Sequence, residues 1–299
     1  MSTRFCHITP FQFFPFSKNY SECFLTLAHL VESHPVYVEQ HLKAYQEFDE
    51  LDLPYTKIMD NSGYEFYKEY GPGYVFDPGK LLELSNMVKA DYIVAPDYPG
   101  QDWRKTQDAM NRFYYDIRKF SHKYVVPKIF YVPQSAPGDL DGYITAFEKV
   151  IIPNSMVKYI GVSILAAPIA YGAEKTPMSF VARTMLMHEL HDRGLLDAAK
   201  KNGIKIHFLG MLDGPREIEL VSPFIDYIDS WDSSAAAQQA LVHDANFDNS
   251  LTGIRAGKSP YPVDFELEYD SDLLHKAAQL VKNCQHINNL ITSVSAGVR

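Results

Sequence analysis

The sequence predicts an α/β fold of the (β/α)8 barrel type. The first observation is a series of apolar segments that each end in polar residues of the kinds found in catalytic sites: 55–66, 90–97, 127–135, 158–164, 204–215 and 224–234. The second is that helix-like stretches separate most of these segments. Polar residues at many strand ends favour a barrel over an open sheet, which gathers them at one switch point.

The size of the chain fits one large barrel. It has 299 residues, of which 46% are hydrophobic, so a sizeable core can be buried. We expect a single domain over residues 1–299, with the barrel core at about 50–260. The aromatic-rich start is expected to be a helical and aromatic elaboration that packs against the core or closes the bottom of the barrel.

Helices are predicted where apolar residues recur at three- and four-residue spacing. Residues 22–48 read as two helical pieces broken near Pro35. Proline near a first helical turn supports three helix starts, at Asp77-Pro78, Thr176-Pro177 and Gly214-Pro215. The remaining predicted helices are 78–89, 101–122, 139–150, 176–202, 214–221, 233–243 and 271–292.

Composition excludes some classes of protein. The net charge of −9 disfavours broad non-specific nucleic-acid binding, although it leaves room for a local basic strip. No run of 18 apolar residues is present, so no membrane partner is expected, and the N-terminus lacks the apolar core of a signal peptide. The three cysteines are far apart and odd in number, which indicates reduced thiols and a cytoplasmic protein.

Asp60 ends the first apolar segment and is followed by Asn61-Ser62-Gly63-Tyr64-Glu65. A carboxylate at a strand end can present its oxygens to a pocket, and the ring of Tyr64 can stack on a planar ligand. A structural interpretation has equal weight, because Asp60 and Asn61 are also typical of an Asx turn.

Three further strand ends carry candidates for recognition. Asp97 ends the second segment, and an ionised carboxylate accepts two hydrogen bonds, although a turn or a helix N-cap explains it as well. Gln134 can both donate and accept, which suits the edge of a purine-like base. Gly161 allows a ligand to approach the backbone, but a β-bulge is an equal alternative.

Asp229 and Asp232 lie where the last strand turns into an Ala-rich helix. A carboxylate there can attack an electrophilic sugar carbon and form a covalent intermediate. A second carboxylate must then move protons, and Asp60 is the candidate. One of the two later aspartates can instead cap the following helix, and with two present both roles can be filled.

Taken together, these segments resemble the tRNA-guanine transglycosylase superfamily of base-exchange barrels. They look most like the phage-type branch that inserts 7-deazaguanine bases, related to queuine and archaeosine, into DNA. The run DNSGYE at 60–65 matches the family's aspartate followed by Ser-Gly-Gly-aromatic-Gln. The resemblance implies a general acid/base at Asp60 and contacts to the base from Ser62, Gly63, Tyr64, Asp97, Gln134 and Gly161.

The resemblance leaves two candidates for the nucleophile. Residues 209–215 approximate the family's Leu-x-Gly-x-Gly-x-Pro turn, and the nucleophilic aspartate lies in the strand that follows. The run DSSAA that begins at Asp232 looks like the Asp-Ser-Ala-Ala run of archaeal members and favours Asp232. Counting from the Gly-Pro turn favours Asp229. We prefer Asp232 and keep Asp229 as the alternative. The resemblance spans about residues 55–260.

Departures from the tRNA enzymes point to a DNA substrate. The chain has no Cys-x-Cys or Cys-x-x-Cys, so the zinc site of those enzymes is not expected. It is also shorter than they are and has no segment that resembles an RNA-binding domain. We expect no cofactor, a free 7-deazaguanine base of the preQ0 or preQ1 type as co-substrate, and a homodimer as in many family members. Contacts to the nucleic-acid backbone are predicted from Arg104, Lys105, Arg255 and Lys258.

The predicted activity is therefore base exchange, with guanine replaced through a covalent Asp–sugar intermediate. The predicted location is the cytoplasm, which is that of the host if the chain is phage-encoded. Three alternatives stay open. The same chemistry can act on tRNA, a two-carboxylate barrel can hydrolyse a small glycoside, and a non-catalytic barrel can bind nucleobases.

Overall fold

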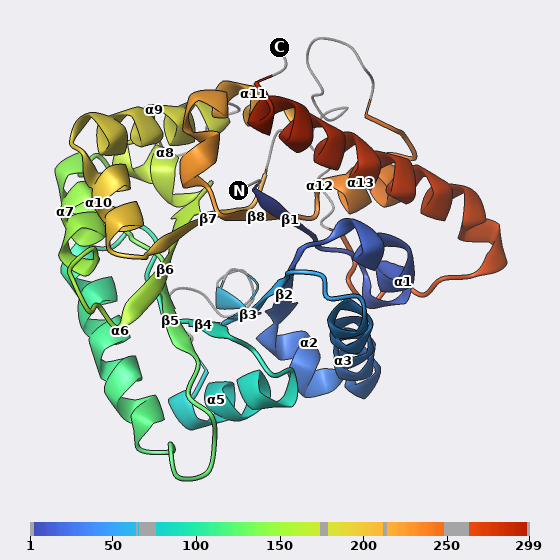
Figure 1. The fold of residues 1–299 in the computed structure, drawn as a ribbon, viewed down its shortest axis with the longest axis horizontal. Helices are drawn as coiled ribbons and strands as arrows, with labels where there is room; N and C mark the ends of the chain where they lie inside the picture. Colours follow the sequence, from blue (N-terminus) through green and yellow to red (C-terminus); the bar gives the residue numbers. More distant parts are fainter. Residues whose placement is uncertain are drawn as a thin grey trace.

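Eight parallel strands curve into a barrel in this computed structural model (Figure 1). The structure describes residues 3–63, 65, 76–173, 179–211, 214–247 and 263–297. The strands follow one another around the sheet in the order β1-β8-β7-β6-β5-β4-β3-β2. They are β1 (Arg4–His7), β2 (Cys23–Leu27), β3 (Thr56–Asp60), β4 (Tyr92–Val94), β5 (Lys128–Tyr131), β6 (Val157–Ser163), β7 (Lys205–Leu209) and β8 (Ser230–Ser233).

Contacts between β1 and β2 bring the two ends of the sheet together. The backbone N–H of Leu25 donates to Cys6 Sγ at 3.2 Å, and that of Glu22 donates to the Phe5 carbonyl at 2.9 Å. The sheet is thus a nearly closed barrel with helices between its strands, which confirms the predicted (β/α)8 class.

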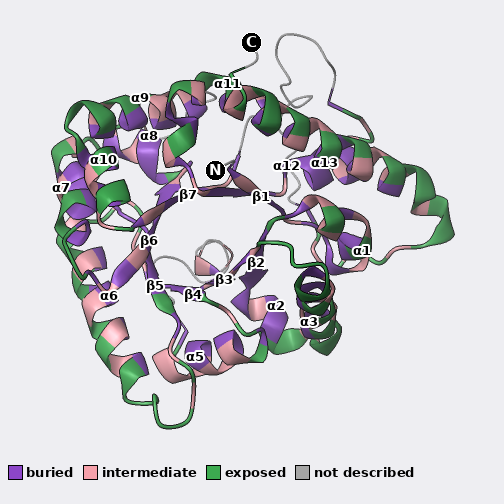
Figure 2. Cartoon of the chain, in the orientation of Figure 1, coloured by how far each residue is buried: buried purple, intermediate pink, exposed green. Residues whose placement is uncertain are grey.

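Helices surround the sheet, and buried residues concentrate on the strands and on the helix faces turned towards them (Figure 2). Among the described residues no helix is long and apolar enough to cross a membrane. The helices are α1 (Phe14–Ser17), α2 (Ala28–Ser33), α3 (Pro35–Glu50), α5 (Pro78–Met87), α6 (Trp103–Arg118), α7 (Leu140–Val150), α8 (Ala166–Ala170), α9 (Ser179–Asp192), α10 (Leu195–Lys201), α11 (Arg216–Leu220), α12 (Ala235–Ala237) and α13 (Leu274–Ser295).

Local sequence signals explain several of these boundaries. Asp77 caps α5 by accepting a hydrogen bond from the Lys80 N–H, as predicted from Asp77-Pro78. The long helix expected at 176–202 is instead two helices, because Gly194 adopts a left-handed φ of 70° between α9 and α10. The predicted start at Thr176-Pro177 lies outside the described residues.

The strands β1 and β2 were not predicted, and the prediction that a helix begins at residue 22 is wrong. Residues 23–27 form β2, and every one of them is buried. A strand buried on both faces has no polar alternation, so periodicity cannot separate it from a helix. The barrel therefore begins at Arg4 in β1 rather than near residue 50.

Inward side chains of alternate strands stack in layers inside the barrel, as is usual for this fold. Phe130 from β5 and His207 from β7 lie edge to face, with ring centroids 5.4 Å apart. His207 is paired in register with Gly161 of β6 on one side and with Ser230 of β8 on the other. Asp232, two residues further along β8 than Ser230, belongs to the next layer towards the carboxyl ends of the strands.

Candidate active site

Four predicted residues lie at the carboxyl end of the barrel. Asp60 is the last residue of β3, Asp97 and Gln134 follow the ends of β4 and β5, and Asp232 is the third residue of β8. Burial and Glu65 raise the pKa of Asp60 most, and Asp232 and Asp97 raise it further by electrostatic repulsion, so these carboxyl groups lie within range of interaction. The structure thus brings these residues together on one rim.

A tight turn after β3 holds Asp60. The N–H of Ser62 donates to Asp60 Oδ1 at 2.6 Å, and that of Gly63 donates to Asn61 Oδ1 at 2.7 Å. Ser62 has a φ of 54° and its hydroxyl accepts from the His29 N–H at 3.2 Å, which fixes this strained turn to α2. The Asx-turn interpretation is confirmed, and the turn uses only one oxygen of Asp60.

Asp60 is an acid whose proton is held unusually tightly. Withdrawal from solvent raises its pKa well above the usual range, and the neighbouring Glu65 carboxyl adds to the effect. The Ser62 N–H opposes the shift without reversing it. A carboxyl group of this kind can deliver a proton near neutral pH.

Asp97 and Gln134 form a hydrogen-bonded pair. Gln134 Nε2 donates to Asp97 Oδ2 at 2.6 Å. Burial raises the pKa of Asp97 to about 6, against the lowering effect of hydrogen bonds from Gln134 and Asn61. The other amide atom, Gln134 Oε1, is buried and has no hydrogen-bond partner among the described residues. An acceptor left in this state suits a ligand with N–H donors.

Asp232 is held through a single oxygen. His207 Nε2 lies 2.8 Å from Asp232 Oδ1, and the Gly210 N–H donates to the same atom at 3.3 Å. No hydrogen bond to Oδ2 is seen within the part of the chain that the structure describes. One oxygen is thus anchored by two hydrogen bonds, and the described residues donate none to the other.

Asp229 is not part of this cluster. It lies just before β8, and its Oδ2 accepts a hydrogen bond from the N–H of Ile206, near the start of β7. Its charged neighbours are Lys205, Arg4 and Lys200. Asp229 therefore lies at the amino end of the barrel, so the alternative assignment of the nucleophile to Asp229 lacks geometric support.

The two predicted glycines have different surroundings. Gly161 lies within β6, where a Cβ atom would come within 2.6 Å of the Phe130 ring and 2.7 Å of Leu209. Packing inside the barrel therefore requires glycine at this position, and the sheet irregularity lies at Ile129/Phe130 instead. A Cβ atom on Gly63 would lie 3.6 Å from Asp97 Oδ1, so this glycine borders the cluster.

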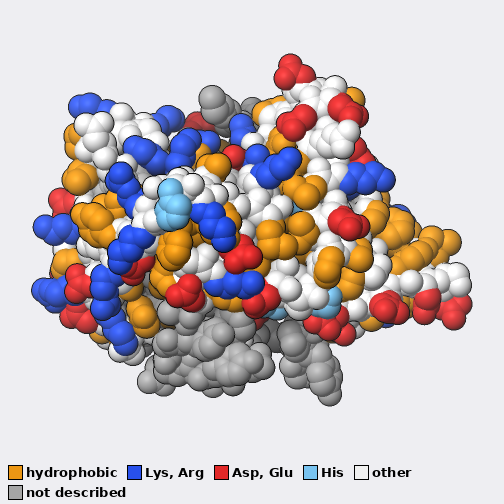
Figure 3. All heavy atoms as spheres, turned by 90° about the horizontal axis from the view of Figure 1, so that it is seen from below, with side chains coloured by type: hydrophobic (Ala, Val, Ile, Leu, Met, Phe, Trp, Pro, Cys, Tyr) orange, Lys and Arg blue, Asp and Glu red, His pale blue; other side chains and the backbone are white. Residues whose placement is uncertain are grey.

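The predicted backbone-binding residues are in part on the same rim. Arg104 and Lys105 begin α6, which follows the carboxyl end of β4. Both are exposed; Arg104 pairs with Asp102 at 3.1 Å, and the Lys105 ammonium lies 4.5 Å from the centre of the Tyr98 ring. On the face in Figure 3, basic and acidic side chains are interspersed. Tyr64, Arg255 and Lys258 lie outside the described residues.

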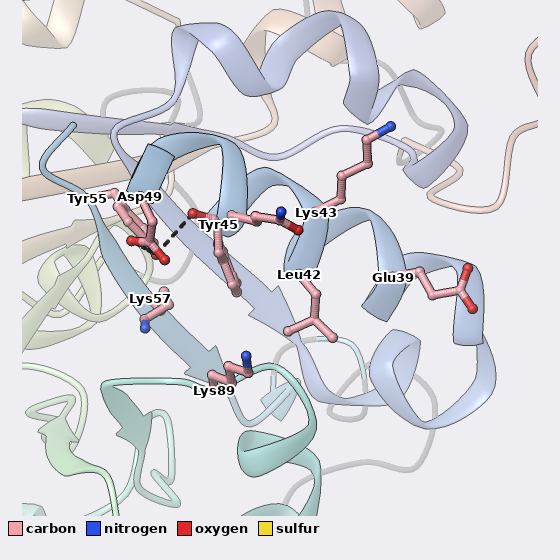
Figure 4. Close-up of a pocket in the computed structure, with 9 residues that line it drawn as sticks. Glu39, Leu42, Lys43, Tyr45, Asp49, Tyr55, Lys57 and Lys89 are labelled. Atoms are coloured by element: carbon pink, nitrogen blue, oxygen red, sulfur yellow. Dashed lines mark hydrogen bonds between the residues drawn. The ribbon is translucent and has the colours of Figure 1, made fainter. Parts of the chain in front are cut away.

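A hollow of about 530 Å³ lies away from the carboxyl cluster, against α3 and the amino end of β3 (Figure 4). The Tyr55 hydroxyl donates to Asp49 at 2.8 Å, and Lys57 pairs with Asp91 at 3.4 Å. These groups already have partners within the protein, and none of the lining residues comes from the carboxyl ends of the strands.

Sequence reasoning missed two residues that support the site. His207 lies inside an apolar strand, and only knowledge that its side chain points into the barrel would have identified it as a candidate. Arg183 occupies a buried position of α9, in register with Phe180 and Leu186, and it forms a fully buried ion pair with Glu217 of α11. A charged residue in the apolar stripe of a helix was the available signal.

All five donor groups of Arg183 are used. Its Nε and Nη2 donate to Glu217 at 2.6 and 2.8 Å, and Nη2 also donates to the Gly210 carbonyl at 2.7 Å. Its Nη1 donates to the carbonyls of Val162 and Leu209 at 3.0 and 2.9 Å. Arg183 therefore fixes the backbone at Gly210, whose N–H contacts Asp232.

We expect Arg183→Leu to destabilise the protein by about 3–5 kcal/mol, because it removes the buried cation that pairs with the Glu217 carboxylate. Urea unfolding measures the change in the free energy of unfolding. The control is Arg193→Leu: Arg193 pairs with Asp141 but its side chain is 44% exposed, so a change below about 1 kcal/mol is expected. Equal losses in the two variants would contradict the role assigned to the buried pair.

Comparison with protein-family models and with curated proteins finds no match to this chain. Among the described residues, no group of three or more His, Cys, Asp and Glu side chains has an arrangement that can hold a metal ion. The function is therefore inferred from the geometry of the site.

Proposed function

We propose that this protein is a base-exchange glycosyltransferase that replaces guanine in DNA with a free 7-deazaguanine base. The observation that carries the proposal is the convergence of three carboxyl groups and a buried amide at one end of the barrel. Such an exchange needs three kinds of group: an acid that holds a proton, a pair of side chains that can recognise a base, and a carboxylate that can act as the nucleophile.

In the first half-reaction, Asp232 Oδ2 forms a bond to the anomeric carbon of the deoxyribose as the bond from that carbon to guanine breaks. The bonding electron pair leaves with guanine, which takes a proton from Asp60. In the second half-reaction, a ring nitrogen of the free base bonds to the anomeric carbon, and the bond to Oδ2 breaks. The proton of the incoming base goes to the ionised Asp60, which restores the starting enzyme.

Base recognition falls to Asp97 and Gln134. An ionised Asp97 accepts from a ring N–H and an exocyclic amine, and Gln134 Oε1 accepts a further donor. The target nucleotide has to leave the base stack before its glycosidic bond can be reached. The absence of a clustered-cysteine motif from this sequence favours DNA over tRNA.

The test is release of label from guanine-labelled DNA in the presence of a free 7-deazaguanine base. Parallel reactions contain labelled tRNA, and others omit the free base. We expect release from DNA that depends on the free base. Release from tRNA but not from DNA would show that tRNA is the substrate. Release without a free base would indicate a hydrolase, and no release from either polymer would contradict base exchange.

The affinity for the free base is expected to depend on pH through Asp97. Its folded-state pKa is about 6, so the carboxyl gains a proton and loses acceptor capacity as the pH falls below that value. The KM for the free base should therefore rise as the pH is lowered from 7 to 5. Asp97→Asn should raise KM by about 10- to 100-fold and flatten this dependence. The control is Asp91→Asn, at the other end of β4. A wild-type KM for the free base that does not change with pH would contradict the assignment.

A further inference from the structure

His207 is a fully buried histidine in the core of the barrel, directly behind Asp232. Its Nε2 lies 2.8 Å from Asp232 Oδ1, and its Nδ1 lies 2.6 Å from the hydroxyl oxygen of Ser230. Ser230 Oγ in turn lies 2.7 Å from the hydroxyl of Tyr159. A continuous line of hydrogen bonds thus runs from Asp232 into the barrel interior.

Chemistry fixes the direction of these hydrogen bonds. The proposed reaction needs Asp232 as a carboxylate, which can only accept, so His207 Nε2 is the donor in this pair. In a neutral imidazole Nδ1 then accepts, so Ser230 donates to it and its oxygen is free to accept from Tyr159. Burial raises the pKa of Tyr159 well above its usual range, so this hydroxyl keeps its proton and serves as the donor.

The packing around His207 leaves little freedom to the ring. Phe130 lies edge to face against it at 5.4 Å between centroids, and Tyr159 does so at 6.0 Å. The ring is therefore held by two aromatic neighbours and by hydrogen bonds at both nitrogens. A donor fixed in this way can set the orientation of the carboxylate it contacts.

We propose that His207, as its Nε2–H tautomer, is a positioning residue that anchors Asp232 Oδ1 and thereby selects Oδ2 as the atom that attacks the sugar. This inference rests on the proposed function, because it assigns the nucleophilic oxygen of that reaction. The N–H of Gly210, just after the end of β7, supports the same orientation, and Arg183 holds the carbonyl of Gly210 in place. Misplacing a reacting group by about 1 Å can reduce a rate by about 100-fold.

The test compares two substitutions of His207 in the 299-residue chain. His207→Phe keeps an aromatic ring but removes the donor, so we expect kcat to fall about 100-fold with the KM for the free base changed by less than about twofold. His207→Gln places an amide N–H near the position of Nε2 and should recover kcat to within about 10-fold of wild type. Tyr159→Phe, which removes only the last donor in the line, should have the smallest effect.

Two measurements separate positioning from simple packing. Trapping of the covalent DNA adduct gives the active fraction, so that kcat refers to folded enzyme. Nitrogen-15 NMR of labelled histidine reports the tautomer without any activity assay, and the proton is expected on Nε2.

Equal losses of kcat in His207→Phe and His207→Gln, wild-type kcat in His207→Phe, or a proton on Nδ1 would each overturn the role of His207 and leave base exchange standing. A wild-type protein that exchanges no base would overturn the proposed function, and this inference with it.

Discussion

Asp232→Asn is expected to abolish base exchange, with a loss of about 10⁴-fold or more in kcat. The amide keeps the size of the side chain, and its oxygen can still accept from His207 and Gly210. It cannot serve as the nucleophile, so no covalent sugar intermediate forms. Single-turnover release of labelled guanine from DNA measures the loss.

The matched control is Asp229→Asn, three residues earlier in the chain. Asp229 accepts a hydrogen bond from the Ile206 N–H at the amino end of the barrel, and an asparagine oxygen can still accept it. We expect activity within about threefold of wild type, since about 10 Å of strand separates the two positions. A large loss in Asp229→Asn with an active Asp232→Asn would reverse the assignment.

Asp60→Asn is expected to slow release of guanine by about 10²- to 10⁴-fold, because the leaving base no longer receives a proton. Burial raises the pKa of Asp60, so the wild-type rate of adduct formation should fall as the pH rises through that pKa. In Asp60→Asn this fall should disappear. Rates of adduct formation across a pH series provide the measurement.

Stability gives an independent check on the same carboxyl group. Because the folded-state pKa of Asp60 is raised, its contribution to stability is complete below the unfolded-state pKa and is lost as the pH rises through the folded value. Asp60→Asn removes this loss, so its thermal midpoint should exceed that of wild type at neutral and higher pH. Asp102→Asn, an exposed N-cap on the same rim, should leave both pH profiles unchanged. Unaltered profiles in Asp60→Asn would contradict the assigned acid.

The sequence was sufficient to place much of the candidate site because the signal is topological. Asp60, Asp97 and Gln134 each come at or just after the end of an apolar strand, and parallel strands in a barrel bring such ends to one rim. No knowledge of side-chain contacts was needed for that step. The hydrogen bond between Asp97 and Gln134 is a consequence of it.

The choice between Asp229 and Asp232 required knowing where β8 begins. Residues 224–234 read as one apolar segment, but Ser222–Tyr227 form a 3-10 helix with Pro223 in its first turn, and the strand starts only at Ser230. That start leaves Asp229 at the amino end of the barrel and Asp232 near the opposite rim.

His207 could not be recognised from the sequence for a related reason. Barrel strands are buried on both faces, so no alternation of polar and apolar residues shows which side chains of β7 point into the barrel. The same lack of alternation concealed β2, which is buried throughout. Arg183 and Glu217 are far apart in the sequence, and only the packing of α9 on α11 brings them together.

Peptide mapping of the trapped DNA–protein adduct tests the central claim most directly. The protein is incubated with the DNA substrate without a free base, denatured and digested, and the modified peptide is identified by mass spectrometry. We predict a deoxyribose-linked adduct on the peptide that contains Asp232, and none on this peptide in Asp232→Asn. An adduct on another residue, or base exchange that proceeds without any adduct, would contradict the account.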